Sequence, residues 1–133
     1  MRKFNILVVG AGVAGLTCAG LLKKQGVNPT VVEKDSIKKF NKSGYMLGIL
    51  PLGGRVMTAL DLMENYFGAS VEMKQYEVHK ENGQLNHAYS LDFINRDYGS
   101  YRGIERAKLI DLLMKKVGKE NVLFGTQVAE MKH

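Results

Sequence analysis

Three glycines near the start of the chain have a spacing that can bind phosphate. Gly10, Gly12 and Gly15 form a Gly-x-Gly-x-x-Gly pattern between an apolar run and a segment with helical periodicity. In such a turn the first glycine lets the chain leave a strand sharply, the second lets backbone N–H groups approach a pyrophosphate, and the third lets the helix pack closely on the strand. The intervening Val13 and Ala14 begin the predicted helix, where the helix dipole attracts an anion.

An acidic residue strengthens this interpretation. Glu33 closes the apolar run 30–33 and follows the glycines by about 20 residues, where a carboxylate can accept hydrogen bonds from ribose hydroxyls. A carboxylate at this place also repels a 2′-phosphate, which argues against NADP. A glycine-rich turn with a coincidental glutamate is the alternative, but the strand before the glycines and the helix after them favour a dinucleotide site.

Apolar periodicity predicts the elements that position these residues. Residues 4–9 are typical of a strand buried on both faces of a parallel sheet, 13–25 of a helix that ends near Gly26, and 30–33 of a second strand. Residues 34–43 are polar and predict a loop or short helix, whose lysines could help to hold an anionic cofactor. An extended segment, 44–50, and a helix over 53–64 follow.

The second half of the chain predicts a β-hairpin and a further helix. Residues 71–93 form two alternating runs around Asn82-Gly83, a dipeptide typical of hairpin turns. His87 lies on the apolar face of the return strand, and we expect a packed or edge histidine rather than a metal ligand. After a polar link over 95–100 we expect a helix over 106–117 and strands over 121–124 and 127–131.

Composition limits the remaining possibilities. With 133 residues, the chain is one domain at most. The net charge of +6 is spread over lysine pairs, and neither nucleic-acid-binding nor zinc-ligand spacing is present, so we predict no nucleic-acid partner and no metal site. Cys18, the single cysteine, lies in an apolar helix pattern and is expected to be buried. Without a disulfide, a signal peptide or a long apolar run, the sequence predicts a cytoplasmic protein with no membrane span.

The sequence resembles a known family along most of its length. Residues 6–27, together with the run that ends at Lys34, resemble the N-terminus of FAD-dependent monooxygenases of the single-component aromatic-hydroxylase type, such as p-hydroxybenzoate, kynurenine and tetracycline hydroxylases. Segment 48–53 resembles the part of that family that passes the flavin, and Arg106-x-x-Leu-x-x-x-Leu resembles the start of a later helix. The resemblance therefore implies that Lys34, Leu47, Gly48 and Arg106 contact FAD, besides the glycine loop and Glu33.

The resemblance implies an α/β fold: a Rossmann-like βαβ FAD-binding domain of the glutathione-reductase type, with a β-hairpin inserted at 70–94. The family's later Asp-Gly and Gly-Asp motifs are absent from this sequence, so we expect residues 1–133 to be a truncated N-terminal portion of that domain. The complete enzyme would use NAD(P)H and O₂ to hydroxylate a small organic substrate. No catalytic residue is predicted, and this chain alone is expected to be nearly inactive, because the flavin supplies the chemistry.

Two other functions remain open. The chain could belong to an FAD-dependent reductase of the geranylgeranyl-reductase type, whose opening sequence is similar. It could also be a non-catalytic dinucleotide-binding module that pairs with a second chain. In either case a truncated fold leaves apolar surface uncovered, so we expect self-association or a complementing C-terminal chain.

Overall fold

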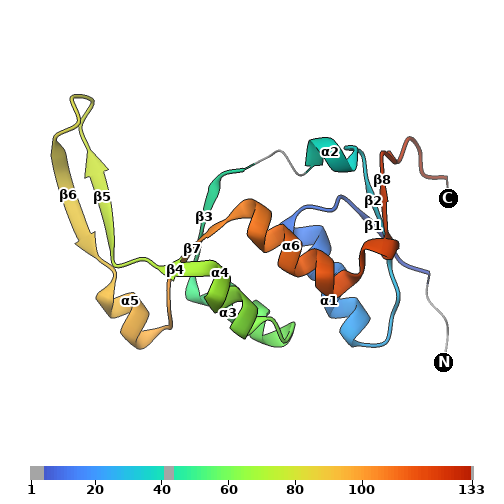
Figure 1. Cartoon of the computed structure of the whole chain (residues 1–133), viewed down its shortest axis with the longest axis horizontal. Helices are drawn as coiled ribbons and strands as arrows, with labels where there is room; N and C mark the ends of the chain where they lie inside the picture. Colours follow the sequence, from blue (N-terminus) through green and yellow to red (C-terminus); the bar gives the residue numbers. More distant parts are fainter. Residues whose placement is uncertain (1–4, 41–43, 133) are drawn as a thin grey trace.

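The computed structural model describes residues 5–40 and 44–132 of the chain. One end of the molecule is a parallel sheet of three strands, in the order β1 (Leu7–Val9), β2 (Thr30–Glu33) and β8 (Val122–Phe124) (Figure 1). The helix α1 (Val13–Lys24) connects β1 to β2. The predicted α/β class and its βαβ unit are therefore confirmed.

The register of this sheet gives it one covered face. Val31 of β2 pairs with Val8 of β1 and with Val122 of β8, so these three side chains form one row. Val31 and Val122 are buried and Val8 packs against the same core. This inner row faces α1 and the long helix α6 (Arg106–Val117), which supply Leu16, Leu109 and Leu113 to the core.

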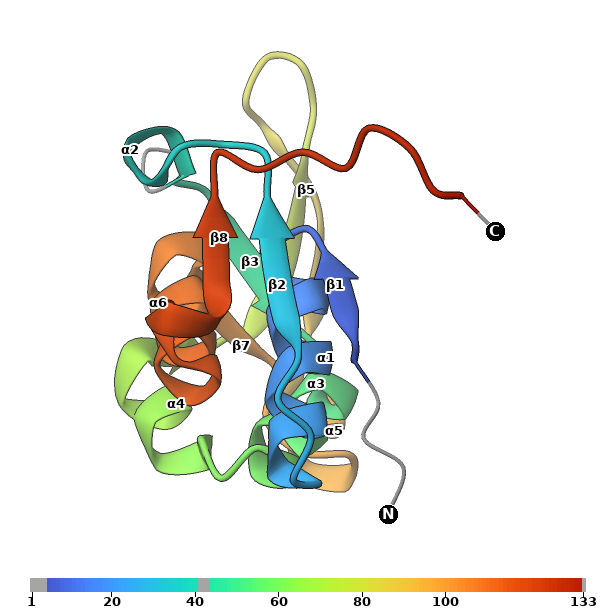
Figure 2. The ribbon, with the colours of Figure 1, turned by 90° about the vertical axis from the view of Figure 1, so that its right-hand side faces the viewer.

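The opposite face of the sheet is open, which corrects the expectation that the first strand is buried on both sides. The next row in register is Val9, Val32 and Leu123, and its outer members Val9 and Leu123 are 67% and 49% exposed. In Figure 2 the three strands face the viewer, and no described helix or strand lies in front of them. Although β1 is apolar on both faces, the described helices cover only one face of its sheet.

The helices α1 and α6 run in the same direction across the inner face (Figure 1). Near their C-terminal ends, Lys23 Nζ donates to the carbonyl of Val117 at 2.8 Å. Gly20 lies so close to α6 that a Cβ there would be 3.6 Å from a side-chain carbon of Lys116. Because the helices are parallel, their N-termini lie at the same edge of the molecule.

A second, antiparallel sheet follows, with the order β3 (Met46–Ile49), β7 (Arg102–Glu105) and β4 (Ser70–Glu72). Two helices, α3 (Pro51–Ala59) and α4 (Met63–Ala69), replace the single helix predicted over 53–64. The break is at Asp61, whose φ of +58° is incompatible with a continuous helix.

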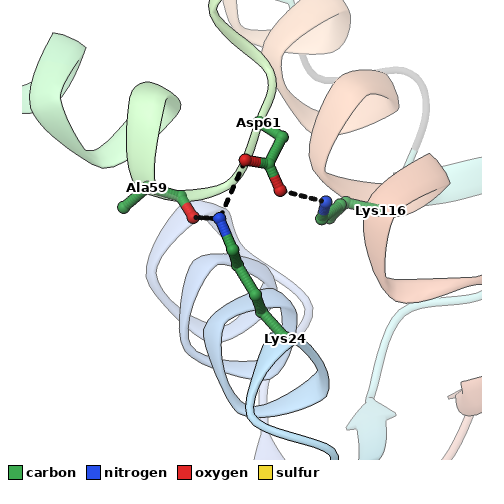
Figure 3. A network of polar contacts seen from close by, with 4 residues as sticks. All are labelled: Lys24, Ala59, Asp61 and Lys116. Carbon is green, nitrogen blue, oxygen red and sulfur yellow. Dashed lines mark hydrogen bonds and ion pairs between the residues drawn. The ribbon is translucent and has the colours of Figure 1, made fainter.

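Asp61 also links three parts of the chain (Figure 3). One carboxylate oxygen accepts a hydrogen bond from Lys24 Nζ of α1 at 2.8 Å, and the other accepts one from Lys116 Nζ of α6 at 3.2 Å. Lys24 Nζ donates in addition to the carbonyl of Ala59 at 2.7 Å. The turn between α3 and α4 is therefore held against the C-terminal ends of α1 and α6.

The predicted hairpin is present as β5 (Gln75–His79) and β6 (Leu85–Ser90), which project away from the rest of the molecule (Figure 1). Gly83 has a φ of +81°, as a tight turn requires. His87 is exposed on β6, which among the described strands pairs only with β5, so it is an edge histidine. The return strand stops at Ser90 rather than continuing to residue 93. Leu91 is buried instead, and α5 (Asp92–Asp97) begins where a polar link was expected to follow.

Three further expectations concern short segments. Residues 34–43 contain the short helix α2 (Ile37–Phe40), although 41–43 lie outside the described residues. After the 3₁₀ turn η1 (Lys119–Asn121) and β8, residues 127–131 do not form the predicted strand. There the Thr126 N–H donates to the carbonyl of Glu33, so the chain crosses the end of β2 and leaves the sheet.

Cys18 is exposed rather than buried, because it lies on the side of α1 that faces a groove shared with α3. This groove has a volume of about 620 Å³ and an almost wholly apolar lining. Among the described residues, no helix is long and apolar enough to cross a membrane.

Candidate dinucleotide-binding site

The glycine loop joins the end of β1 to the start of α1 in a conformation that requires glycine at two places. Gly10 has a φ of +99°, which side-chain-bearing residues rarely adopt, and its N–H donates to the carbonyl of Val32 at 2.7 Å. A Cβ at Gly15 would lie 1.9 Å from the carbonyl oxygen of Gly10. The first turn of α1 can therefore rest on the strand end only if residue 15 has no side chain.

The N-terminus of α1 is open toward a ligand. Gly12 is the N-cap residue and has no side chain, so among the described residues no side chain caps the first N–H groups of α1. A Cβ at Gly12 would meet no atom within 4 Å. Val13 and Ala14 form the first turn beside it. This combination of free donors, helix dipole and open space is suited to a pyrophosphate.

Glu33 holds the loop in place from the next strand. Its side chain is buried, with 8% exposed, and its two carboxylate oxygens accept hydrogen bonds from the N–H groups of Ala11 and Asp35, each at 2.9 Å. The carboxylate thus ties the turn after β1 to the turn after β2. Each oxygen keeps further acceptor capacity, so a ribose hydroxyl could still donate to it.

Arg106 is the first residue of α6, and α6 starts at the same end of the helix pair as α1 (Figure 1). Its guanidinium carbon is 5.5 Å from the ring centroid of Phe40 and 5.8 Å from that of Tyr45. Both distances allow cation–π attraction. Its backbone N–H donates to the carbonyl of Tyr45 at 2.9 Å. Arg106 is therefore held between α2 and the segment that leads into β3.

The other predicted contacts lie around this edge. Lys34 is exposed directly after Glu33. Leu47 and Gly48 lie on β3, opposite Ile104 and Gly103 of β7, the strand that leads directly into Arg106. Leu47 is half-buried against the core, and a Cβ at Gly48 would lie 2.5 Å from Tyr101 Oη. A side chain at residue 48 would therefore require the end of the Tyr101 side chain to move aside.

Several groups at the site could not be identified from the sequence. No sequence motif marks Ala11 and Asp35 as residues whose N–H groups bind a carboxylate. Phe40 and Tyr45 are far from Arg106 in sequence. Only the folded chain shows that Glu33 and Arg106 find these partners. Within the described part of the chain, no cluster of His, Cys, Asp and Glu side chains could hold a metal ion.

Comparison with known proteins identifies the family to which this chain is similar. The sequence profile of the FAD-dependent oxidoreductases matches residues 5–125. Among curated proteins, the FAD-dependent monooxygenase olcE of Penicillium canescens is 28% identical over 132 residues, which is 98% of this chain and 28% of that protein. The FAD-dependent monooxygenase cle3 of Aspergillus versicolor is 33% identical over 113 residues, or 84% of this chain and 23% of that protein.

Solved structures share the fold. The structure of Pseudomonas aeruginosa PqsL in complex with 2-aminobenzoylacetate superposes with a TM-score of 0.78 at 23% identity, over 98% of this chain and 36% of that one. Klebsiella pneumoniae HpxO, complexed with FAD and uric acid, gives 0.76 at 22% identity, over 96% of this chain and 32% of that one. The chain thus spans about a third of these proteins or less, and it belongs to the FAD-dependent oxidoreductase family.

Proposed function

We propose that this chain binds the ADP half of FAD at the turn between β1 and α1. The observation that carries the proposal is the loop itself, in which Gly15 lets α1 rest on the Gly10 carbonyl while the uncapped helix start at Gly12 stays open. The N–H groups of Gly12, Val13 and Ala14 would face the pyrophosphate, and Glu33 would accept hydrogen bonds from the ribose. Lys34 and Arg106 would add positive charge at the same edge, and Leu47 and Gly48 would line the path toward the flavin.

A titration with FAD tests this proposal. We expect flavin fluorescence and the absorbance near 450 nm to change saturably, and we expect FAD to bind more tightly than NAD. In Gly12→Ala the new Cβ points into the open space at the helix start, so FAD affinity should fall by about tenfold or more while the fold is kept. Gly68→Ala is the matched control, because a Cβ there also meets no atom within 4 Å but lies on α4. Equal FAD affinity in both variants would contradict the proposed site.

We further propose that the complete protein is a monooxygenase that uses NAD(P)H and O₂ to hydroxylate a small organic molecule. The names of the curated relatives support monooxygenase over reductase activity, and the 2-aminobenzoylacetate and uric acid in the titles of two similar structures support a small organic substrate. Bound FAD would supply the redox chemistry, and the residues described above would bind and orient it.

On this proposal the 133-residue chain is inactive or nearly so by itself, because it carries the nucleotide end of the site and spans only about a third or less of the proteins that it resembles. NAD(P)H oxidation and oxygen consumption, measured with saturating FAD, test this expectation. We expect rates close to those of free FAD. A yellow protein with stoichiometric FAD and rapid NAD(P)H-dependent oxygen consumption would contradict it.

The outer face of the parallel sheet and the apolar groove between α1 and α3 are two open apolar surfaces of this chain. We propose that these surfaces are covered in the functional protein, either by a second copy or by a complementing chain. Parallel sheets are normally buried on both faces, which supports this proposal.

A further inference from the structure

A small pocket with a mixed apolar and polar lining lies on the side of α3 that faces away from α1. The α3 residues Gly53, Val56 and Met57 line the apolar groove with α1, whereas Gly54, Arg55 and Thr58 border this second pocket. The pocket is closed by α4 and by the loop before β7, and it has a volume of about 140 Å³. One water molecule needs only about 10–15 Å³ by this kind of measure, so the pocket has room for a small molecule or ion.

Tyr66 of α4 lines this pocket, and its hydroxyl group is buried without a partner among the described residues. Tyr66 of α4 is 1% exposed, and its Oη has no hydrogen-bond partner among the described residues. Buried polar groups in folded proteins are nearly always hydrogen-bonded, so such a group needs an explanation. Burial raises the pKa of Tyr66, partly offset by the charge of Arg102, so the hydroxyl stays protonated and can donate a hydrogen bond. An acceptor held in the pocket would satisfy it.

Two arginines give the pocket a positive charge. Arg102 of β7 is 8% exposed, and its guanidinium is fixed by hydrogen bonds to the side-chain and carbonyl oxygens of Ser70, at 2.8 Å each, and by the ring of Phe67 at 4.2 Å. Its Nη1 donates to Ser100 Oγ at 3.3 Å and carries a second N–H.

Arg55 borders the pocket from α3, and none of the described residues that line it is acidic. The carboxylate of Glu72 accepts a hydrogen bond from Ser100 Oγ at 2.7 Å, but Glu72 does not line the pocket.

We propose that this pocket binds a small oxyanion, a carboxylate or phosphate-type group, with Arg55 and Arg102 opposite its charge and Tyr66 Oη donating to one of its oxygens. Guanidinium groups suit such ligands because their N–H groups are arranged in a rigid fork. Arg102 is already immobilised, so little side-chain entropy would be lost there on binding. The proposal is independent of FAD binding, because none of these residues lies in the glycine loop or on α1.

Amide NMR during separate titrations with inorganic phosphate and with acetate tests the proposal. We expect saturable shifts for the amides of Gly54, Gly99 and Ser100, which border the pocket. Shifts confined to the amides of Gly12 to Gly15 would place the anion at the dinucleotide site instead and would overturn the proposal. Saturation with acetate alone identifies a carboxylate site, and saturation with phosphate alone identifies a phosphate-type site.

Three variants sharpen this test. Arg55→Gln should weaken anion binding by about tenfold, and Tyr66→Phe should weaken it several-fold without unfolding the chain, since Oη makes no hydrogen bond to the protein. Arg96→Gln is the matched control: Arg96 is an exposed arginine on α5 that pairs with Asp97 and does not border the pocket. Anion affinity that is equal in all three variants, or shifts that never saturate, would overturn the proposal.

Discussion

Gly12 and Gly15 lack a side chain for different physical reasons, although they belong to the same motif. Gly12 has φ −68° and ψ 179°, a conformation open to any residue, and its missing Cβ leaves space for a ligand. Gly15 is required by the protein itself, because its Cβ would lie 1.9 Å from the Gly10 carbonyl oxygen. A single glycine motif can therefore combine a binding requirement with a folding requirement.

Gly15→Ala should for this reason destabilise the fold rather than only weaken cofactor binding. An alanine in a helix interior normally gains about 1 kcal/mol over glycine, but the clash with a backbone atom should reverse the sign and cost about 1–3 kcal/mol or more. Urea unfolding without FAD would show a lower midpoint for Gly15→Ala. Gly12→Ala should stay within about 1 kcal/mol of the wild type. Similar stability of the two variants would show that α1 can shift away from β1.

Glu33 offers a second prediction at the residue scale. In Glu33→Gln only one oxygen remains, so either the Ala11 or the Asp35 N–H loses its acceptor and faces an amide NH₂ group. An unsatisfied buried donor costs about 1–3 kcal/mol. We expect that loss in urea unfolding without cofactor, and no comparable loss for Glu81→Gln, whose side chain is exposed in the hairpin turn. An unchanged midpoint for Glu33→Gln would mean that the two turns do not depend on this carboxylate.

At the scale of elements, Asp61 makes the packing of α1, α6 and the α3–α4 turn dependent on pH (Figure 3). Hydrogen bonds from Lys24 and Lys116 hold the pKa of Asp61 below its ordinary value of 3.8. A lowered folded-state pKa stabilises the fold above the unfolded pKa, and this contribution is lost as pH falls through the folded one. The stability difference between wild type and Asp61→Asn should therefore be constant from pH 7 to 5 and disappear in stronger acid.

Asparagine is the suitable replacement because it tolerates the positive φ of residue 61. Thermal unfolding of both proteins across the pH range measures the difference. High salt should reduce the same difference at pH 7, because these charges are exposed and are screened. A difference that persists unchanged at pH 2 would show that the carboxylate acts through geometry and not through charge.

The stability of the hairpin should depend on pH in the opposite direction to the contribution of Asp61. His79 Nε2 lies 2.9 Å from Glu77 Oε2 and its Nδ1 lies 3.1 Å from the carbonyl of Gly83, so the imidazolium can donate to both. These bonds, the one to Glu77 first, raise the pKa of His79 above 6.5. The protonated His79 thus stabilises the turn fully at pH values below its pKa in the unfolded chain. This stabilisation is lost as the pH rises through the raised pKa of His79 in the folded chain. In Glu77→Gln, an NMR titration of the His79 ring should move toward 6.5. An unchanged midpoint would exclude the Glu77 contact in solution.

The elements that the sequence predicts well are those in which a local signal and the tertiary structure agree. The glycine loop, α1, β2, the Asn82-Gly83 hairpin and α6 all carry such signals. The break at Asp61 and the helix after Ser90 were missed because both depend on distant partners: two lysines of other helices in the first case, and the burial of Leu91 in the second. The same holds for the site, where Glu33 was predictable but its backbone donors were not.

At the scale of the whole molecule, the open face of the parallel sheet is the feature that the strand sequences leave unexplained. The side chains of Val9 and Leu123 are 67% and 49% exposed in the outer row, on either side of the buried Val32. Water-exposed valine and leucine in a continuous row favour association with another apolar surface. The net charge of +6 opposes contact between two copies, so association of this chain with itself should increase with salt.

Sedimentation velocity over a range of protein concentrations measures this association. Val9→Thr together with Leu123→Thr should shift the population toward monomer, because both changes lower the apolar area of the outer face while keeping residues that suit a strand. Leu52→Thr is the matched control, since Leu52 is equally exposed but lies on α3, away from the sheet. If Leu52→Thr dissociates the protein and the Val9→Thr, Leu123→Thr variant does not, the associating surface lies on the helices. The outer face of β1 and β8 is then exposed to solvent without driving association.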